Sequence, residues 1–346
     1  MENAISVIIC AYTEKRWNEL VAAVESVQRQ TLPPHEIIIV IDHNPALLLR
    51  TQTNLSGIIA IENGGGKGLS GARNSGWKIA QGEIIVFLDD DAIAEKDWLE
   101  NLAACYANPE VVGAGGKIVP LWESSHPSWF PEEFHWVIGC TYRGMPTSSA
   151  RIRNPIGANM SVRRSALVTA GGFRESFGWD RDQNASRESL KWLKPSVGDE
   201  ETELCMRVSQ QLPGSIWLYI PLAIVQHRVP AQRTRWTYFL WRCYSEGLGK
   251  ASLVKLHTTS TGLSSEKTYT FKTLPKGVAR GLADTILNFD LAGSLRAGAI
   301  TVGLATTTAG YLIGILSSEK ADFGHTNPTS LRHNRSAEAS SPVKVR

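Results

Sequence analysis

The chain has 346 residues, of which 42% are hydrophobic and 20% are charged, and its formal net charge is +3. This length and hydrophobic content predict either two domains or one large α/β domain with a sizeable core. The small net charge, without a basic helix or an arginine-rich run, argues against a nucleic-acid partner. The five cysteines are scattered and form no CxxC pair, so neither a disulfide framework nor a zinc site is indicated.

The first hundred residues alternate between two kinds of segment. Short apolar runs predict four strands, at residues 5–10, 36–41, 58–61 and 84–88. Three further segments predict helices, at residues 18–30, 70–80 and 97–107. Strands that alternate with helices at this spacing imply βαβ units, so we expect an α/β fold with a mostly parallel sheet. No charged segment with an apolar core precedes the first strand, which favours a cytoplasmic protein without a signal peptide.

The pattern changes after residue 110. The proline- and tryptophan-rich segment 120–155 predicts loops, followed by helices at 165–171 and 200–211 and a strand at 216–220. From residue 236 onward we expect helices, and the polar residues 320–346 predict a disordered tail. Residues 297–318 carry no charge and are long enough to span a bilayer. Their glycine, alanine and threonine content favours a helix packed on the domain or lying in the membrane interface.

Three consecutive aspartates, Asp89, Asp90 and Asp91, follow the predicted strand at 84–88. Neighbouring carboxylates repel one another, and a bound cation would allow them to stay ionised together. The carboxyl end of a parallel strand is also where α/β folds bind ligands. We therefore expect a divalent metal here, and through it a phosphate; the alternative is a solvated acidic turn.

The segment Gly66–Gly71 fits the GxGxxG pattern of dinucleotide-binding folds. That pattern belongs to the first βα turn, and here the first turn is Ala11-Tyr12-Thr13-Glu14, without glycine. A dehydrogenase is therefore disfavoured. The glycines still permit a close approach of the backbone to a ligand, and Lys67 and Arg73 could pair with phosphate oxygens.

Two further groups of polar residues come later in the chain. Asp199, Glu200 and Glu201 open a predicted helix, where they are either a favourable helix start or the source of a general base. His227 follows the predicted strand at 216–220 and is either structural or a metal ligand. The segment 232–236, Gln-Arg-Thr-Arg-Trp, suits a polyhydroxyl or phosphorylated acceptor, or equally the start of a surface helix.

Together these motifs resemble the inverting glycosyltransferases of family 2, which have the GT-A fold, over roughly residues 4–245. The resemblance rests on the segments 6–12, 36–42, 71–76, 80–83, 157–160 and 171–173, and on Asp89 and Asp91 at the DxD positions. It implies a Rossmann-like sheet flanked by helices, with a nucleotide-sugar-binding half at 1–110, an acceptor-binding half at 111–230 and a helical C-terminal extension at 231–319.

The resemblance also assigns roles to individual residues. Mg²⁺ or Mn²⁺ would be held by Asp91 and Asp89, with His227 completing the shell. The nucleotide-sugar donor would meet the residues Ala11, Tyr12, Glu14, Asp42, Lys67, Arg73, Asp89 and Asp90. The acceptor would meet Gly157, Asn159, Arg235 and Trp236, and the tryptophan-rich segment 122–136 either shapes the acceptor site or forms a hydrophobic plug.

One position departs from the family. The usual base is an aspartate, and this chain has Glu201 there, so the role could move to Glu200 or Asp199. Segment 232–236 also fits the QxxRW pattern of processive, membrane-embedded members, but this chain has at most one span. We therefore expect a non-processive hexosyltransferase that adds one sugar.

The acceptor and the competing functions follow from the same resemblance. Similar enzymes act on polyprenyl-linked sugars, so we expect a UDP-sugar donor and a lipid-linked glycan or cell-surface precursor as acceptor. The enzyme would then work at the inner face of the cell membrane, with residues 297–318 contacting its surface. The alternatives are nucleotidyl transfer, which would want a glycine-rich first turn, and a catalytically weak nucleotide-sugar-binding scaffold.

Overall fold

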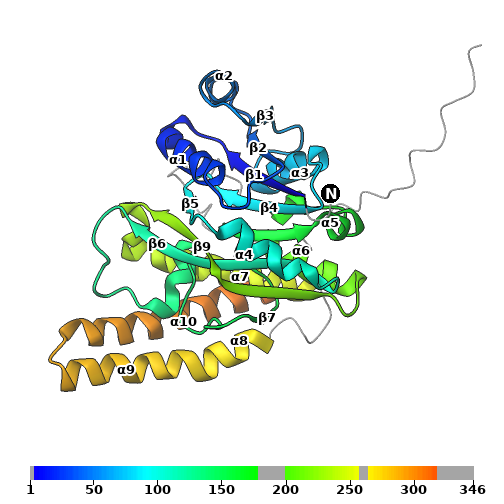
Figure 1. The fold of residues 1–346 in the computed structure, drawn as a ribbon. Coiled ribbons are helices and arrows are strands. Elements are labelled where there is room, and N and C mark those ends of the chain that lie inside the picture. The colour runs from blue at the N-terminus through cyan, green and yellow to red at the C-terminus, as the bar shows by residue number, and fades with distance from the viewer. Residues whose placement is uncertain (1–3, 178–198, 257–263, 318–346) are drawn as a thin grey trace, which may run out of the picture.

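The computed structural model describes residues 4–177, 199–256 and 264–317 (Figure 1). Its first half consists of β1 (Ile5–Ala11), α1 (Trp17–Gln28), β2 (Glu36–Ile41), α2 (Pro45–Asn54), β3 (Ile59–Glu62), α3 (Leu69–Ile79) and β4 (Ile84–Asp89). These four strands pair in parallel, β1 with β2 and β4, and β2 with β3. The alternation expected from the sequence is therefore confirmed. Helix α2 was not predicted; it begins at Asn44, whose Oδ1 accepts a hydrogen bond from the Leu47 N–H.

The second half adds strands of both directions. It contains β5 (Ala92–Ala94), α4 (Trp98–Ala104), β6 (Val111–Trp122), β7 (Ala150–Ile152), β8 (Asn159–Arg163), α5 (Arg164–Ala170), α6 (Glu200–Gln211) and β9 (Ile216–Val229). The sheet order is β3-β2-β1-β4-β8-β6-β9-β5, with β7 beside β9. β8 runs antiparallel to β4 and β6, and β5 and β7 run antiparallel to β9. Six of the nine described strands, β1 to β4, β6 and β9, therefore run in one direction, so the sheet is mixed but mostly parallel, as expected from the sequence.

The composition of β6 explains why it was missed. Glycine weakens a strand unless a neighbour needs its space, and β6 has glycines at 113, 115 and 116. A Cβ at Gly113 would lie 2.2 Å from the Trp217 ring, and one at Gly116 would lie 1.7 Å from the Ala223 carbonyl oxygen. The glycines therefore let β6 approach the side chains and backbone of β9.

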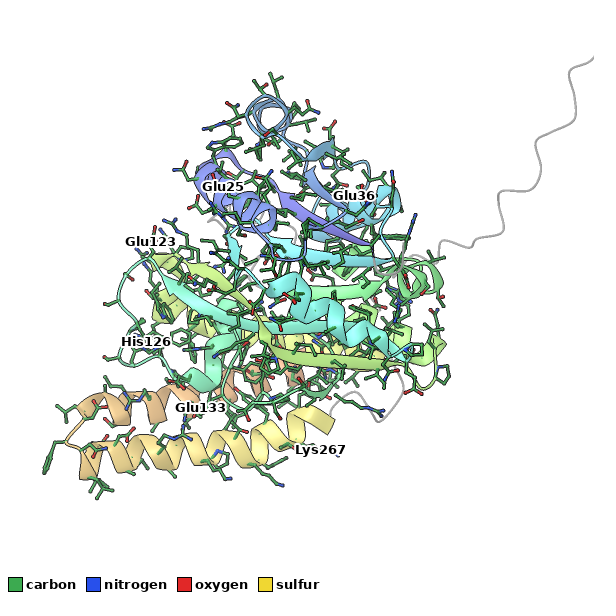
Figure 2. All side chains as sticks on the ribbon, viewed as in Figure 1. Glu25, Glu36, Glu123, His126, Glu133 and Lys267 are labelled. Carbon is green, nitrogen blue, oxygen red and sulfur yellow. The ribbon has the colours of Figure 1, made fainter. Side chains whose placement is uncertain are left out.

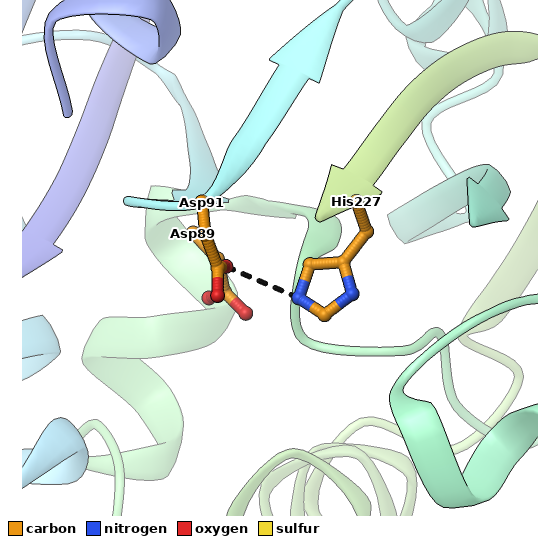
Figure 3. Close-up of side chains that lie close together, drawn as sticks. All are labelled: Asp89, Asp91 and His227. Carbon is orange, nitrogen blue, oxygen red and sulfur yellow. Dashed lines mark ion pairs between the residues drawn. The ribbon is translucent and has the colours of Figure 1, made fainter. Parts of the chain in front are cut away.

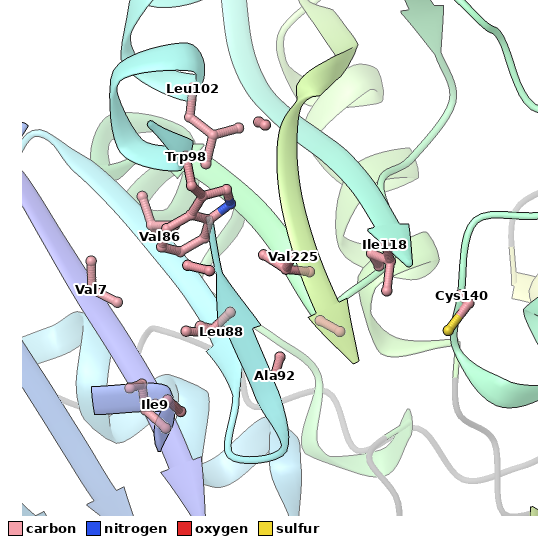
Figure 4. Close-up of a cluster of buried hydrophobic side chains, with 14 of the residues drawn as sticks. Val7, Ile9, Val86, Leu88, Ala92, Trp98, Leu102, Ile118, Cys140 and Val225 are labelled. Carbon is pink, nitrogen blue, oxygen red and sulfur yellow. The ribbon is translucent and has the colours of Figure 1, made fainter. Parts of the chain in front are cut away.

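The core lies on both faces of this sheet. On one face, Trp98 and Leu102 of α4 pack over Val86 and Leu88 of β4 (Figure 4). The indole Nε1 of Trp98 donates to Asn159 Oδ1 at 2.8 Å. The Asn159 amide in turn donates to the carbonyl oxygens of Ala223 and Lys117. Because this side chain is fully buried and engaged with the framework, we no longer propose Asn159 as an acceptor contact.

The C-terminal part is helical and consists of α7 (Trp236–Leu256), α8 (Ser264–Thr268), a π-helical turn (Tyr269–Thr273), α9 (Leu274–Leu287) and α10 (Leu291–Leu316). α10 packs closely on α7, since a Cβ at Gly310 would lie 2.3 Å from the Tyr244 carbonyl oxygen. α9 is tied to the domain by Arg280, whose Nη1 lies 2.8 Å from an oxygen of Glu133. Figure 2 shows Glu133 close to the two C-terminal helices. α10 is also the one described helix long and apolar enough to cross a membrane. The predicted tail, 320–346, lies outside the described residues.

Candidate active site

The pairing of β5 with β9 brings the predicted metal ligands together. β4 ends at Asp89, Asp91 follows, and Ala92 of β5 lies opposite His227 of β9. As a result, His227 Nε2 lies 3.1 Å from Asp91 Oδ1. Ligand atoms of Asp89, Asp91 and His227 all lie within 4.8 Å of one another (Figure 3). His227 was expected after the strand but belongs to it, because β9 continues to Val229.

This group of side chains fits a divalent cation. Two carboxylates and one imidazole offer the oxygen and nitrogen ligands that suit Mn²⁺, and the carboxylates also suit Mg²⁺. Burial lowers the pKa of His227, but the nearby carboxylate of Asp91 outweighs it and raises this pKa to about 10, so His227 would have to release its proton to bind a cation. Reciprocally, despite the same burial, His227 and Arg16 lower the pKa of Asp91 below its usual range. The carboxylate of Asp91 is therefore ionised at neutral pH.

Two arginines that sequence reasoning did not single out complete this cluster. Arg16 Nη1 lies 2.9 Å from Asp90 Oδ1 and 3.0 Å from Asp91 Oδ2. Arg233 Nη2 approaches Asp91 Oδ2 at 3.9 Å. The sequence could have indicated both residues, because Arg16 lies in the turn after β1 and Arg233 lies within the 232–236 motif. Asp90, expected near the donor, is buried against Arg16.

The second acidic cluster lies at the start of α6. Glu201 is half-buried, and its Oε1 accepts a hydrogen bond from the Gly157 N–H at 3.1 Å. Glu200 is buried, with Oε1 3.4 Å from Arg73 Nη1. Among the described residues, the second carboxylate oxygen of Glu200 has no hydrogen-bond partner. Asp199 is buried at the N-cap position of the same helix.

Burial dominates the protonation of this second cluster. It raises the pKa of Glu200 to about 8, with the neighbouring Glu201 adding to the shift. It raises the pKa of Asp199 to about 7, with Glu246 as the next cause. The pKa of Glu201 is raised for the same reason, while Arg73 opposes the shift. The cluster thus holds carboxyl groups that exchange protons near neutral pH, as a general base requires.

Arg73 stands between the two clusters. It is buried, with Nη2 3.7 Å from Asp89 Oδ1 and 3.2 Å from the Gly157 carbonyl oxygen, and Nη1 on Glu200. Its guanidinium contacts groups of both clusters, and its predicted role as a donor contact stays a prediction. Gly157 lets these side chains lie close to the backbone, because a Cβ there would lie 2.6 Å from Arg73 Nη2 and 3.0 Å from Glu201 Oε1 and would require them to shift.

The other residues predicted to meet the donor lie around the ends of β1 and β2. Asp42 is buried and accepts hydrogen bonds from the Gly68 N–H and from Asn63 Nδ2, so it fixes the glycine-rich turn. Ala11 is buried in β1, and Tyr12 is half-buried with Arg16 over its ring. Glu14 and Lys67 are exposed.

On the acceptor side, Arg235 and Trp236 are exposed at the start of α7. The Trp236 ring stacks on Phe239 with centroids 5.2 Å apart and meets Trp129 edge-on at 4.8 Å. Phe239 also contacts Phe134, at 5.2 Å. The tryptophan-rich segment therefore packs as a hydrophobic cluster that supports Trp236. This position agrees with both expectations for segment 122–136, a hydrophobic plug and a wall of the acceptor site.

A Rossmann-like mixed sheet with carboxylates at the end of a central strand defines the nucleotide-sugar-dependent transferases of the GT-A fold. A mannosyltransferase from Pyrobaculum calidifontis, solved with GDP-Man and Mn²⁺, has a TM-score of 0.57 and 16% sequence identity, and the match covers 92% of this chain and 89% of that one. This likeness supports the fold. The profile of Glycosyl transferase family 2 matches residues 6–169.

Curated relatives narrow the assignment. The glucosyl-dolichyl phosphate glucuronosyltransferase of Haloferax volcanii is 30% identical over 317 residues, which is 90% of this chain and 96% of that protein. The UDP-Glc:alpha-D-GlcNAc-diphosphoundecaprenol beta-1,3-glucosyltransferase of Escherichia coli is 42% identical over 89 residues, which is 25% of this chain and 35% of that protein. The chain therefore belongs to glycosyltransferase family 2 and is a glycosyltransferase of the GT-A fold.

Proposed function

We propose that the protein moves a single sugar from a nucleotide-diphosphate sugar, with a UDP-sugar favoured, to a hydroxyl of a lipid-linked glycan. The reaction would depend on Mg²⁺ or Mn²⁺ and would invert the anomeric centre. The observation that carries the proposal is the placement of two acidic clusters on either side of Arg73. One cluster is suited to a cation and its diphosphate, and the other to a proton.

On the donor side, Asp89, Asp91 and His227 would hold the cation, which supplies charge neutralisation for the departing diphosphate. Arg16 and Arg233 both lie against Asp91 and add fixed positive charge next to the cation site. Because these groups are held by ion pairs within the sheet framework, little reorganisation is needed when charge develops on the leaving group.

On the acceptor side, Glu201 would remove the proton from the attacking hydroxyl. The hydroxyl oxygen would bond to the anomeric carbon as the bond to the diphosphate breaks, and the proton would end on the Glu201 carboxylate. The Gly157 N–H orients this carboxylate. Its raised pKa makes it a stronger base once it is ionised. A single displacement of this kind needs one base and inverts the sugar carbon.

The lipid-linked acceptor is supported by the name of the Haloferax relative, which specifies a glucosyl-dolichyl phosphate. In this chain the exposed indole of Trp236 offers a face on which a sugar ring can stack, and Arg235 offers a cation for a phosphate. We place the enzyme at the cytoplasmic face of the membrane, where polyprenyl-linked sugars and nucleotide sugars would both be accessible.

The test begins with the thermal stability of the full chain against UDP-, GDP-, dTDP- and CMP-sugars, with and without Mn²⁺. We expect a stabilising shift for a UDP-sugar that requires the metal. That donor is then offered with polyprenyl-phosphate-linked glucose, and the product is resolved by mass spectrometry. Metal-dependent donor binding without transfer to any lipid-linked sugar would favour the scaffold alternative, and no binding of any donor would overturn the proposal.

A further inference from the structure

The hairpin of α9 and α10 exposes an unusual number of apolar side chains. Twelve of the twenty large apolar residues exposed in the described part of the chain lie between residues 271 and 316. Five of them fall within ten residues at the loop that joins the helices: Ile286, Leu287, Phe289, Leu291 and Leu295, with exposed fractions from 58% to 88%. The eight exposed large apolar residues before residue 271 are spread along the chain, whereas a concentrated patch marks an interaction surface.

The loop is built to hold these side chains outward. Arg296 Nη2 lies 3.1 Å from an oxygen of Asp284 and 2.7 Å from one of Asp290, so the charged groups of the loop pair with one another. α9 and α10 meet closely below the loop, where a Cβ at Gly281 would lie 2.5 Å from the Gly293 carbonyl oxygen. Phe289 has φ of +52°, which is rare for a bulky residue. The loop end projects away from the rest of the domain (Figures 1 and 2).

Charge around the apolar patch identifies its partner. Lys272, Lys276 and Arg280 recur every fourth residue and form a basic row along the helical segment that leads into the loop. Arg280 pairs with Glu133, whereas Lys272 and Lys276 are exposed and carry the charge that the row presents. Arg296 is the one charged residue of α10, and it pairs with Asp284 and Asp290. The exposed face of α10 carries no other charge. A basic row beside an apolar face is typical of helices that lie on anionic membranes. A second copy of the chain would instead bring the same lysines face to face in a symmetric dimer.

The hairpin is also continuous with the acceptor side of the active site. A Cβ at Gly303 of α10 would lie 2.6 Å from the Phe134 ring and 2.9 Å from the Phe239 ring. Phe239 stacks on Trp236, which we assign to the acceptor. A membrane at the hairpin would therefore lie next to the residues that receive the sugar of a lipid-linked acceptor.

We propose that the α9–α10 hairpin is a membrane-docking surface. The apolar side chains of its loop end, residues 286–295, enter the apolar layer of an anionic bilayer, while Lys272 and Lys276 contact the phosphate headgroups. α10 stays packed on α7 and does not span the bilayer. This inference deepens the proposed function, and its test measures vesicle binding rather than sugar transfer, so the two can fail independently.

The first test is flotation of the full chain with vesicles of phosphatidylcholine, with and without phosphatidylglycerol. We expect binding to the anionic vesicles, and we expect the pair Leu287→Ser and Phe289→Ser to weaken it by about a hundredfold or more, since each buried apolar side chain contributes at least about a factor of ten. The matched control is Leu49→Ser with Leu222→Ser, whose exposed fractions of 67% and 66% are comparable but which lie outside the hairpin. Thermal unfolding of each variant is measured first, so that a loss of binding is not caused by a loss of folding.

The second test separates the basic row from the loop. Lys272→Glu with Lys276→Glu should lower binding to phosphatidylglycerol vesicles and leave the weak binding to pure phosphatidylcholine unchanged. Lys78→Glu with Lys96→Glu reverses two exposed lysines elsewhere and should bind as the unmodified chain does.

Two results would overturn the proposal. One is a loop variant that floats as well as the unmodified chain. The other is an unmodified chain that sediments as a dimer, does not bind vesicles, and becomes a monomer when Leu287 and Phe289 are replaced, because the patch would then be a self-association surface. Transfer to a short-chain, water-soluble acceptor should persist in the loop variants, which shows that the active site is intact.

Discussion

The active site contains two groups of three consecutive acids whose surroundings give them opposite electrostatics. Asp91, in the first group, is surrounded by His227, Arg16 and Arg233, and its pKa is lowered although it is buried. Glu200, in the second group, is buried beside Glu201 with Arg73 as its cation, and its pKa is raised to about 8. Similar residue types therefore support different chemistry.

The difference lies in the number of cations that face each carboxylate. Burial raises a carboxyl pKa and neighbouring cations lower it, so their balance decides whether the group is an anion or a proton acceptor. A permanent anion suits a metal, and a carboxyl group that titrates near neutral pH suits a base. The environments of the acids therefore support the two proposed roles, which the sequence pattern alone does not separate.

Glu201→Gln tests the base role and should have the largest effect. It removes the proton acceptor and keeps the amide oxygen near the Gly157 N–H, so we expect transfer to fall by about 10²- to 10⁴-fold. Donor affinity should stay unchanged, because Glu201 belongs to the acceptor side. Initial rates and donor-induced thermal shifts measure the two effects.

Glu200→Gln is the matched control for this experiment. It alters the adjacent carboxylate, which is engaged by Arg73, and we expect a smaller loss of transfer. If the control loses activity and Glu201→Gln does not, Glu200 is the base and our assignment of Glu201 is wrong.

Asp91→Asn tests the cation role of the first cluster. Loss of the carboxylate that His227 and both arginines contact should weaken Mn²⁺ affinity by at least the roughly 10- to 100-fold that loss of a supporting group costs. Calorimetric titration of Mn²⁺ in the presence of the donor measures this change. Asp97→Asn, at an exposed acid shortly after β5, serves as the control and should bind Mn²⁺ normally. Equal affinities for both variants would remove the metal role from Asp91.

The sequence predicted the parallel half of the fold and the position of Asp89 and Asp91, because β1, β2 and β4 are apolar runs that are followed by polar turns. It did not predict how β5 pairs with β9, and that pairing is what sets His227 beside Asp91. The short β5 and the glycine-rich β6 carry little strand signal of their own. The position of Arg73 between the two clusters depends on long-range packing, and its role as a donor contact stays a prediction.

The smallest expected effect is on the pH dependence of stability. Glu200 holds its proton more tightly in the folded chain, where its pKa is about 8, than in the unfolded chain, where a glutamate titrates near about 4.3. Its contribution to stability is therefore complete below the unfolded value and is lost as the pH rises through about 8. Glu200→Gln should flatten this decline.

The measurement is the free energy of unfolding in urea at about pH 5 and about pH 9. Between these values the contribution of the Glu200 proton to stability changes most. From the lower to the higher pH, the free energy of unfolding should fall less for Glu200→Gln than for the unmodified chain, because glutamine does not ionise. Glu62→Gln, at an exposed glutamate, should follow the unmodified chain at both values. If Glu200→Gln also follows it, burial does not hold a proton on the second cluster, and the electrostatic contrast between the two acidic groups disappears.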